Sequence, residues 1–308
     1  MQQCSSNDCD VIIVNYNAGV LISKCVQSVL DSNVRHVFVV DNGSHDDSLD
    51  SLSASYCNAP VTLIRNERNL GFASACNIGV RSSTAEFLLF LNPDSILTDG
   101  SLSCMMGTLK SDPSIGMVGG LLCNPDGSEQ PGGRRVFPTP RRALMRAFGL
   151  SYLSKWLPSI FSDFLLHREP LPDNPTPVEA ISGACMLVKR EALRDVGLWD
   201  EGYFLHCEDL DWCMRFSLMN WRVVFVPGAR IFHMLGACSR SRPFFVEWHK
   251  HNGMLRFYNK FFRKRYSGLL WVGVVLCVWL RFCLVSIYFA TRLLKGRIER
   301  AARGAART

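Results

Sequence analysis

The sequence lacks the features that mark several classes of protein. Of its 308 residues, 48% are apolar and only 23 are glycine. These values exclude an intrinsically disordered chain and a collagen. No heptad repeat persists, so a coiled coil is also excluded. The mean hydropathy is only +0.08, which argues against a polytopic membrane protein. The length is sufficient for one large α/β domain or two smaller ones.

Cysteine is frequent, but its pattern is not that of a disulfide framework. The 13 cysteines are odd in number and include no CxxC pair. The N-terminal MQQCSSNDCD lacks the basic start and apolar core of a secretory signal. We therefore expect a cytoplasmic location, no signal peptide and reduced thiols. A zinc site formed by Cys207, Cys213 and His206 is an alternative, although its spacing differs from that of common zinc motifs.

Short apolar runs alternate with helical patterns in the first hundred residues. We predict strands at 11–14, 37–40, 61–64 and 87–91, and helices over 21–30 and from about residue 73. This alternation predicts a doubly wound α/β domain. The strands are followed by Asn15, Asp41, Asn66 and Asp94. Carboxyl ends of parallel strands form ligand sites, so these side chains are expected to line one site, although Asn and Asp also dominate ordinary turns.

The pattern changes after this domain and then resumes. Residues 134–177 are rich in Pro and Arg with interspersed aromatics, such as Trp156 and Phe161. We predict that this segment is a surface excursion, inserted or facing an acceptor. Regular structure resumes at 178–190, with a short helix over 191–196 and a strand over 222–226.

A set of short motifs runs in order through residues 10–235. They are VIIVNYN at 11–17, DNGS at 41–44, NLGFASACNIG at 69–79, LNPD at 91–94, SGACMLVKREAL at 182–193, GLWDEGYF at 197–204, EDLDWCMR at 208–215 and WRVVFVPGARIFH at 221–233. With these motifs the chain resembles the family-2 glycosyltransferases, and within them the bacterial rhamnosyltransferase-like branch. The resemblance implies a GT-A fold, a Rossmann-like nucleotide-sugar-binding domain with a mixed central sheet, over residues 1–235.

The resemblance also implies a reaction: inverting transfer of a sugar from a nucleoside-diphosphate donor to a lipid-linked or cell-envelope glycan. Overall similarity, rather than any single residue, implies dTDP-L-rhamnose as the donor. One alternative is a sugar nucleotidyltransferase, but residues 15–19 do not supply its glycine-rich triphosphate loop. Another is a catalytically silent, membrane-anchored glycan-binding protein, which would be expected to have lost the acidic motif at 208–211.

A divalent cation is the implied cofactor, because the charge on the leaving diphosphate must be neutralised. Asp94 occupies the last position of a DxD-like motif in which Asn92 replaces the first Asp. By resemblance, His233 is a second ligand, although a histidine that is simply hydrogen-bonded at a strand end remains an alternative. Mg²⁺ or Mn²⁺ suits such ligands.

The acidic motif Glu208-Asp209-x-Asp211 supplies the candidate general base. Acids at a helix start also complement the helix dipole, and Asp211 and Arg215 have the spacing of an ion pair. By resemblance, Asp209 is the expected base and Glu208 the alternative, whereas Asp211 is expected to support the local geometry through Arg215.

Donor binding is expected on the loops that follow the early strands. Asp41 is expected to accept the imide N–H of a uracil or thymine base, and Arg68 to contact the diphosphate, although a solvated loop arginine is equally consistent. The other expected donor-binding residues are Asn15, Tyr16, Asn69, Gly71, Asn77, Asn92, Asp94, Ser182, Gly183 and Ala184.

The C-terminal region, residues 236–308, is predicted to be helical and membrane-associated. Residues 269–290 contain a single charge, Arg281, and are long enough to span a bilayer. Basic residues flank this segment on both sides, so a single span, a helix in the membrane surface and a re-entrant pair all fit. A buried core helix or dimer helix is a further alternative. The position of the net charge of +7 favours lipid phosphate over nucleic acid as its partner, and the cytoplasmic face of the plasma membrane as the location.

Overall fold

The computed structural model describes residues 8–56, 58–147, 164–234 and 242–305. The chain forms two compact units. The sheet unit consists of Met1–Pro138 and Asp163–Cys238, and the helical unit of Thr139–Ser162 and Ser239–Thr308. Trp156 and Phe161, which the sequence places in a surface excursion, lie outside the described residues.

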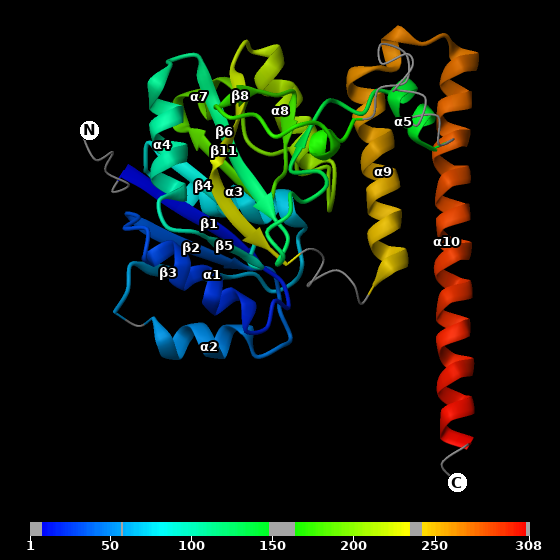
Figure 1. The fold of residues 1–308 in the computed structure, drawn as a ribbon, viewed down its shortest axis with the longest axis horizontal. Helices are drawn as coiled ribbons and strands as arrows, with labels where there is room; N and C mark the ends of the chain where they lie inside the picture. Colours follow the sequence, from blue (N-terminus) through cyan, green and yellow to red (C-terminus); the bar gives the residue numbers. More distant parts are fainter. Residues whose placement is uncertain (1–7, 57, 148–163, 235–241, 306–308) are drawn as a thin grey trace. The chain divides into compact units, whose positions relative to one another are not determined.

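A nine-stranded mixed sheet forms the centre of the sheet unit (Figure 1). Its strands are β1 (Cys9–Asn15), β2 (His36–Asp41), β3 (Val61–Arg65), β4 (Phe87–Leu91), β5 (Ser95–Leu97), β6 (Ile115–Cys123), β8 (Thr176–Pro177), β10 (Cys185–Lys189) and β11 (Arg222–His233). The order is β3-β2-β1-β4-β10-β6-β11-β5, with β8 paired to β11. Strands β1 to β4 pair in parallel, whereas β10 is antiparallel to both β4 and β6. The mixed α/β sheet predicted from the sequence is thereby confirmed.

Helices cover both faces of this sheet. They are α1 (Leu21–Leu30), α2 (Ser48–Ser55), α3 (Phe72–Ser82), α4 (Ser101–Ser111), α7 (Arg190–Val196) and α8 (Glu208–Leu218). The 3₁₀ turn η3 (Leu166–Arg168) also belongs to the sheet unit. On β1, Val11 and Ile13 join a buried cluster with residues of α1. Ile12 points to the other face, where it leaves no room for a side chain at Gly79 of α3. Burial on both faces explains why this strand is a continuous apolar run.

The thiols lie mainly in the core. Ten cysteines fall among the described residues, and all ten are free. Burial raises the pKa of Cys185 and Cys213 to about 12, so these thiols stay protonated and inert at neutral pH. Among the residues that the structure describes, no group of three His, Cys, Asp or Glu side chains could hold a metal, so the alternative zinc site at Cys207, Cys213 and His206 does not form.

The start of segment 134–177 is not a surface excursion, so that prediction is wrong there. Arg134 is 5% exposed and pairs with Glu129, with 2.8 Å between its Nε and Oε1. Residues Arg134–Arg135 form β7, which pairs with β9 (Ala180–Ile181) in a separate two-stranded sheet. Arg134 is thus held inside the sheet unit by an ion pair, and Arg135 by the pairing of β7 with β9.

The helical unit contains α5 (Pro140–Ala147), α9 (Pro243–Phe261), the 3₁₀ turn η4 (Arg263–Arg265) and α10 (Gly268–Ala305). Because α10 is one unbroken helix, the re-entrant pair considered for 269–290 is excluded. Within α10, Gly268–Lys295 is long and apolar enough to cross a membrane, and only 6% of its most apolar window is buried. This exposure also contradicts the buried core helix.

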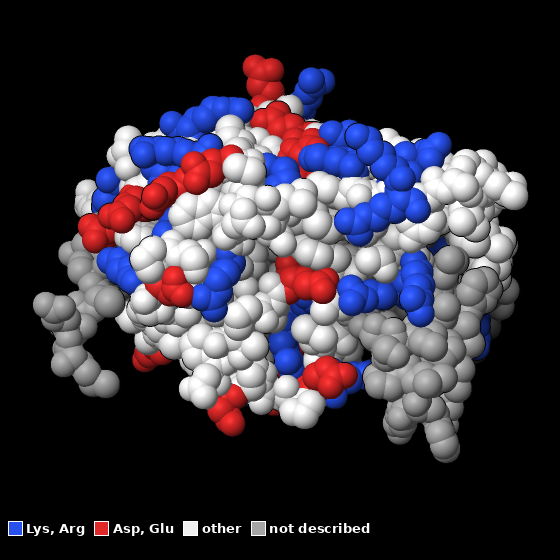
Figure 2. Space-filling model, turned by 90° about the horizontal axis from the view of Figure 1, so that it is seen from above, with Lys and Arg blue, Asp and Glu red and all other residues white. Residues whose placement is uncertain are grey.

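Charged side chains are interspersed on the molecular face in Figure 2. Lysines and arginines alternate there with aspartates and glutamates over the described surface. The net charge of +7 is therefore not gathered into one uninterrupted basic field on this face.

Candidate active site

Asp41, at the end of β2, is held in a dense network. Its two carboxylate oxygens accept hydrogen bonds from the Asn15 amide (2.8 Å), the Ser44 hydroxyl (2.5 Å) and the backbone amides of Gly43 and Ser44 (3.2 and 3.1 Å). Four donors fill the acceptor capacity of a carboxylate. Asn15 is fully buried, and Asp41 is 2% exposed. Both residues therefore shape the loop after β2. For Asp41 to accept the expected bond from the imide N–H of a base, one of these four donors must leave.

The loop before α3 is organised by a residue that the sequence analysis did not single out. The Asn42 amide nitrogen donates to Asn69 Oδ1 at 2.9 Å, and Asn42 Oδ1 accepts from the Leu70 amide at 3.0 Å. Gly71 has φ of +90°, and a Cβ there would lie 2.8 Å from the Phe204 carbonyl oxygen. Gly71 is thus required by the approach of another backbone segment. Arg68 in the same loop is exposed, and Tyr16 is half-buried.

Asn77, expected to bind the donor, is committed elsewhere. Its amide nitrogen donates to the Trp199 carbonyl (3.0 Å) and to Glu201 Oε1 (2.8 Å), and its oxygen accepts from the Trp199 amide (3.1 Å). The Trp199 ring packs against Trp212 at 4.1 Å between centroids. We therefore expect Asn77 to position the 199–201 loop rather than to contact the donor.

Asp94 and His233 meet because β5, which follows Asp94, pairs with the end of β11. Asp94 Oδ1 lies 3.2 Å from His233 Nε2, and the two side chains are only 6% and 7% exposed. Asn92 Nδ2 lies 3.4 Å from the same nitrogen. The predicted ligands Asp94 and His233 are thus adjacent, with Asn92 beside them.

Gln130 fixes which ring nitrogen of His233 faces Asp94. The Gln130 amide nitrogen donates to the His233 carbonyl and to Asn124 Oδ1, both at 3.1 Å. Gln130 Oε1 must therefore accept the bond from His233 Nδ1, at 2.6 Å. With the proton on Nδ1, the Nε2 lone pair points to the space between the Asp94 carboxylate and the Asn92 amide nitrogen. A ring nitrogen and a carboxylate oxygen side by side are ligands that suit a divalent cation. The pair thus fits the implied metal.

Asp209, in the first turn of α8, is held on one oxygen by two donors. Arg135 Nη2 lies 2.5 Å from Asp209 Oδ2, and the Gly183 amide donates to the same oxygen at 3.1 Å. The side chains of Arg135 and Asp209 are each 14% exposed. Ala184 follows Gly183, and its carbonyl accepts a hydrogen bond from the backbone N–H of Asn92 at 3.0 Å. The Ser182–Ala184 segment therefore connects Asp209 to the strand end that carries Asp94.

Glu208 and Asp211 have different environments from Asp209. Burial raises the pKa of Glu208 to about 8, with a further contribution from the charge of Asp209. Glu208 Oε2 is buried without a hydrogen-bond partner among the described residues. Asp211 is fully buried and pairs with Arg215 at 2.6 Å, the contact expected from their spacing, and Tyr203 donates a bond to it at 3.1 Å. Because Arg215 also bonds the carbonyls of Val196 and Leu198, Asp211 stabilises the loop before α8.

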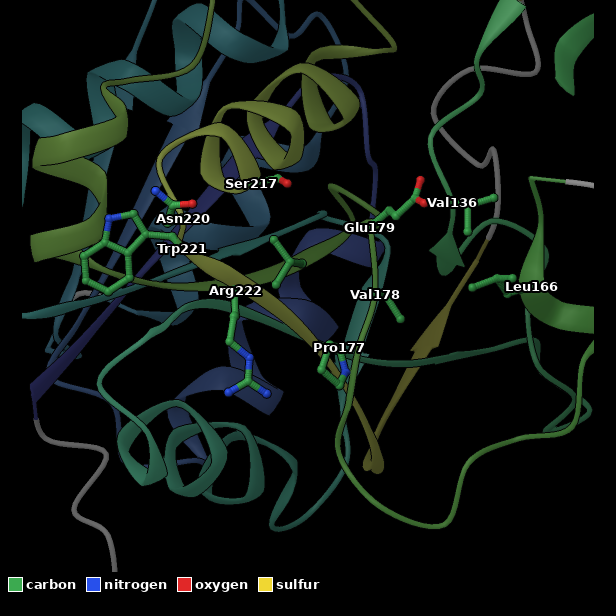
Figure 3. A pocket seen from close by; sticks show the side chains of 10 residues that line it. Val136, Leu166, Pro177, Val178, Glu179, Ser217, Asn220, Trp221 and Arg222 are labelled. Atoms are coloured by element: carbon green, nitrogen blue, oxygen red, sulfur yellow. The ribbon is translucent and has the colours of Figure 1, made fainter. Parts of the chain in front are cut away.

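A separate hollow of about 480 Å³ opens at the other end of β11 (Figure 3). Val178 and Glu179 line one side of it, and Asn220 and Trp221 line the other. None of the predicted site residues belongs to its lining, so it is distinct from the Asp94–His233 end of the strand.

Comparison with known proteins identifies the family. Residues 10–197 match the family model described as glycosyl transferase family 2. The chain belongs to this family. Residues 136–294 also match glycosyl transferase family group 2, a range that extends into α10. Membership explains the order of the motifs and favours glycosyl transfer over nucleotidyl transfer.

Two relatives of this family 2 member are rhamnosyltransferases. The N-acetylglucosaminyl-diphospho-decaprenol L-rhamnosyltransferase of Mycobacterium tuberculosis is 30% identical over 236 residues, which cover 72% of this chain and 75% of the relative. Rhamnosyltransferase WbbL of Escherichia coli is 29% identical over 58% of this chain and 67% of its own length.

Solved structures share the GT-A fold with this family 2 chain. A mannosyltransferase of Pyrobaculum calidifontis in complex with GDP-Man and Mn²⁺ superimposes with a TM-score of 0.56 and 17% identity, covering 84% of this chain and 65% of that one. GalNAc-T7 with UDP, GalNAc and Mn²⁺ gives a TM-score of 0.55 and 18% identity, over 73% of this chain and 43% of that one. This chain therefore spans less than two thirds of both structures.

Proposed function

We propose that this protein is an inverting glycosyltransferase that moves L-rhamnose from dTDP-rhamnose to a lipid-linked or cell-envelope glycan. The observation that carries the proposal is that the Asp94–His233 pair and Asp209 are joined through the Ser182–Ala184 segment. A site of this kind offers a charge-neutralising group and a proton acceptor together. The choice of rhamnose is supported by the two rhamnosyltransferase relatives.

A divalent cation at Asp94 and His233 would neutralise the charge that develops on the departing diphosphate. Mn²⁺ is favoured over Mg²⁺ because an imidazole is one of the two ligands. Mn²⁺ in both solved structures of the same fold supports this choice. Arg68, exposed on its loop, is a further group that can approach the diphosphate, and Tyr16 can frame the base or ribose.

Asp209 is the proposed general base, which takes the proton of the attacking acceptor hydroxyl. Arg135 and the Gly183 amide hold its Oδ2, and the Leu210 backbone amide donates to its Oδ1 at 2.8 Å, so contacts on both oxygens fix the direction of the carboxylate. Glu208 is a poorer candidate, because burial raises its pKa to about 8 and keeps it largely protonated at neutral pH. Glu208 in its protonated form is a neutral neighbour of Asp209 and does not repel the negative charge on that carboxylate.

The test is release of nucleoside diphosphate from a panel of sugar donors with a polyprenyl-diphosphate-linked acceptor. We expect Asp209→Asn to lower turnover roughly 10²–10⁴-fold, the usual contribution of a general base, and Glu208→Gln to leave it within a few-fold. If both folded variants kept full turnover, Asp209 would not be the base. Activity that survives EDTA unchanged would exclude the metal role, and no release from any donor would favour the silent glycan-binding protein.

The proposed location is the cytoplasmic face of the plasma membrane, with the helical unit as the anchor. The exposed apolar helix Gly268–Lys295 supports this proposal. Fractionation of cells that express the full chain tests it. We expect recovery with the plasma membrane, and recovery in the soluble fraction would contradict the anchor.

A further inference from the structure

One side of α10 is a continuous apolar surface, here called the apolar stripe. Its residues follow each other at intervals of three or four, which places them on one side of the helix. They are Leu269, Val272, Leu276, Leu280, Leu284 and Ile287, with exposed fractions from 53% to 85%. The stripe is about 27 Å long at 1.5 Å per residue. An exposed apolar surface of this length indicates a binding face.

The opposite side of α10 packs against α9, which runs antiparallel to it. Trp248 of α9 contacts Trp279 at 5.1 Å and Phe282 at 5.7 Å between ring centroids. Nearer the ends of the contact, Phe244 lies 6.5 Å from Phe289 between ring centroids. The two helices thus form a hairpin, and the stripe is the side that α9 does not cover.

The single charge within the apolar stretch is held by α9. Arg281 Nη1 donates to His251 Nε2 at 2.8 Å and lies 3.9 Å from Glu247 Oε2. His251 is only 3% exposed, and its Nδ1 bonds the Glu247 carbonyl at 2.7 Å. Arg281 therefore ties the middle of the apolar helix to polar groups of α9.

This pairing opposes a simple transmembrane span. Arg281 lies at the middle of Gly268–Lys295, so Glu247 and His251 would accompany it to the centre of a hydrocarbon core about 30 Å thick. Lys250 pairs with Glu247 at 3.3 Å but is still 42% exposed, so part of its side chain would face lipid near the midplane. The exposed Arg256 would lie within the same core. Charged side chains at that depth are strongly disfavoured. A hairpin lying flat meets none of these costs.

We propose that α9 and α10 form a monotopic hairpin that lies along the surface of an anionic membrane and enters one leaflet only. The apolar stripe contacts the acyl chains, while the polar side of α9 stays at the headgroups. This inference rests on the membrane association proposed above and specifies its geometry. Both ends of α10 then lie on the same side of the membrane as the sheet unit.

Charge selects lipid rather than a second copy of the chain as the partner. Basic residues lie at both ends of the stripe: Arg263–Arg265 before it, and Arg292 and Lys295 after it. Two copies joined through the stripe would bring basic ends together in either orientation. Anionic lipid headgroups complement both ends at once.

Reporter fusions to the full chain test the topology. Green fluorescent protein fluoresces only when it remains in the bacterial cytoplasm, and alkaline phosphatase is active only after export. A flat hairpin predicts that fusions at the N-terminus and at the C-terminus both give the cytoplasmic result. An exported C-terminal reporter would mean that α10 spans the membrane and would overturn the proposal.

Vesicle flotation tests the face. With vesicles of phosphatidylcholine and phosphatidylglycerol at 7:3, we expect Leu276→Glu/Leu280→Glu to reduce bound protein at least tenfold. The matched control Ser82→Glu/Ser103→Glu, which adds the same charge to exposed positions of the sheet unit, should float like the wild type. Equal flotation of both variants, or dimerisation without vesicle binding, would refute the proposal. Donor turnover with a soluble acceptor fragment is measured in parallel, so that a failed anchor is distinguished from a failed reaction.

Discussion

Replacing Glu208 by glutamine should change how the stability of the sheet unit depends on pH. Glu208 is 7% exposed, and burial raises its pKa from an ordinary value of 4.5 to about 8. Between these two values the folded protein keeps a proton that the unfolded chain has already released. The free energy of unfolding therefore falls as the pH rises through this window.

The size of the effect follows from the shift. At about 1.36 kcal/mol per pKa unit, the raised pKa of Glu208 lowers the free energy of unfolding by roughly 5 kcal/mol across the whole window, of which roughly 2 kcal/mol falls between pH 6 and pH 8. The stability that the neutral carboxyl contributes is fully present below pH 4.5 and is lost as the pH approaches 8. A glutamine is neutral throughout and has no such loss.

Urea unfolding at pH 6 and pH 8, followed by tryptophan fluorescence, measures the difference. We expect Glu208→Gln to lose about 2 kcal/mol less than the wild type between these pH values. Glu86→Gln, at an exposed position, is the matched control and should behave like the wild type. If Glu208→Gln and the wild type lost the same free energy, the buried carboxyl would not be protonated in the folded state.

Three further substitutions test the contacts around the site. Arg135→Met leaves the Asp209 carboxylate without its ion-pair partner, so we expect about 3 kcal/mol of destabilisation in urea. Because the charge of Arg135 lowers the pKa of Glu208, the same substitution should raise that pKa further. An unchanged unfolding midpoint would show that the ion pair contributes nothing to stability. Arg215→Met leaves a fully buried carboxylate unpaired and should cost about 3–5 kcal/mol, measured in the same way, whereas a cost below 1 kcal/mol would contradict the assigned burial. Gln130→Leu removes the bond to His233 Nδ1 and should weaken Mn²⁺ binding about 10–100-fold by calorimetry; equal affinity would mean that the ring needs no such partner.

The secondary structure could be predicted from the sequence because its signals are local. The helix predicted at 21–30 is α1, and the predicted strands at 61–64 and 87–91 lie within β3 and β4. Apolar runs report burial on both faces, and helical spacing reports one buried face, without knowledge of any distant residue. The strand-end positions of Asp41 and Asp94 follow from the same reasoning.

The partners of the site residues could not be predicted, because they lie far away in sequence. Arg135 is 74 positions from Asp209, and Gln130 is 103 positions from His233. In the sequence, Arg135 is one of several arginines in a proline-rich stretch, and nothing distinguishes it from its solvated neighbours. Likewise, the pattern around Asn77 cannot reveal that both the nitrogen and the oxygen of its side-chain amide bond to a loop 122 positions away.

The free thiols of the core can be used to measure local opening of the sheet unit. A buried thiol reacts with an alkylating reagent only while the elements around it are separated. Seven such cysteines are distributed over strands and helices of the sheet unit: Cys9, Cys25, Cys76, Cys123, Cys185, Cys207 and Cys213. The alkylation rate at each position, read by mass spectrometry against the exposed Cys104, therefore ranks the local openings of the unlabelled, unmutated enzyme. A ligand that orders the site should slow alkylation at Cys207 and Cys213, near the start of α8, more than at cysteines on the far side of the sheet.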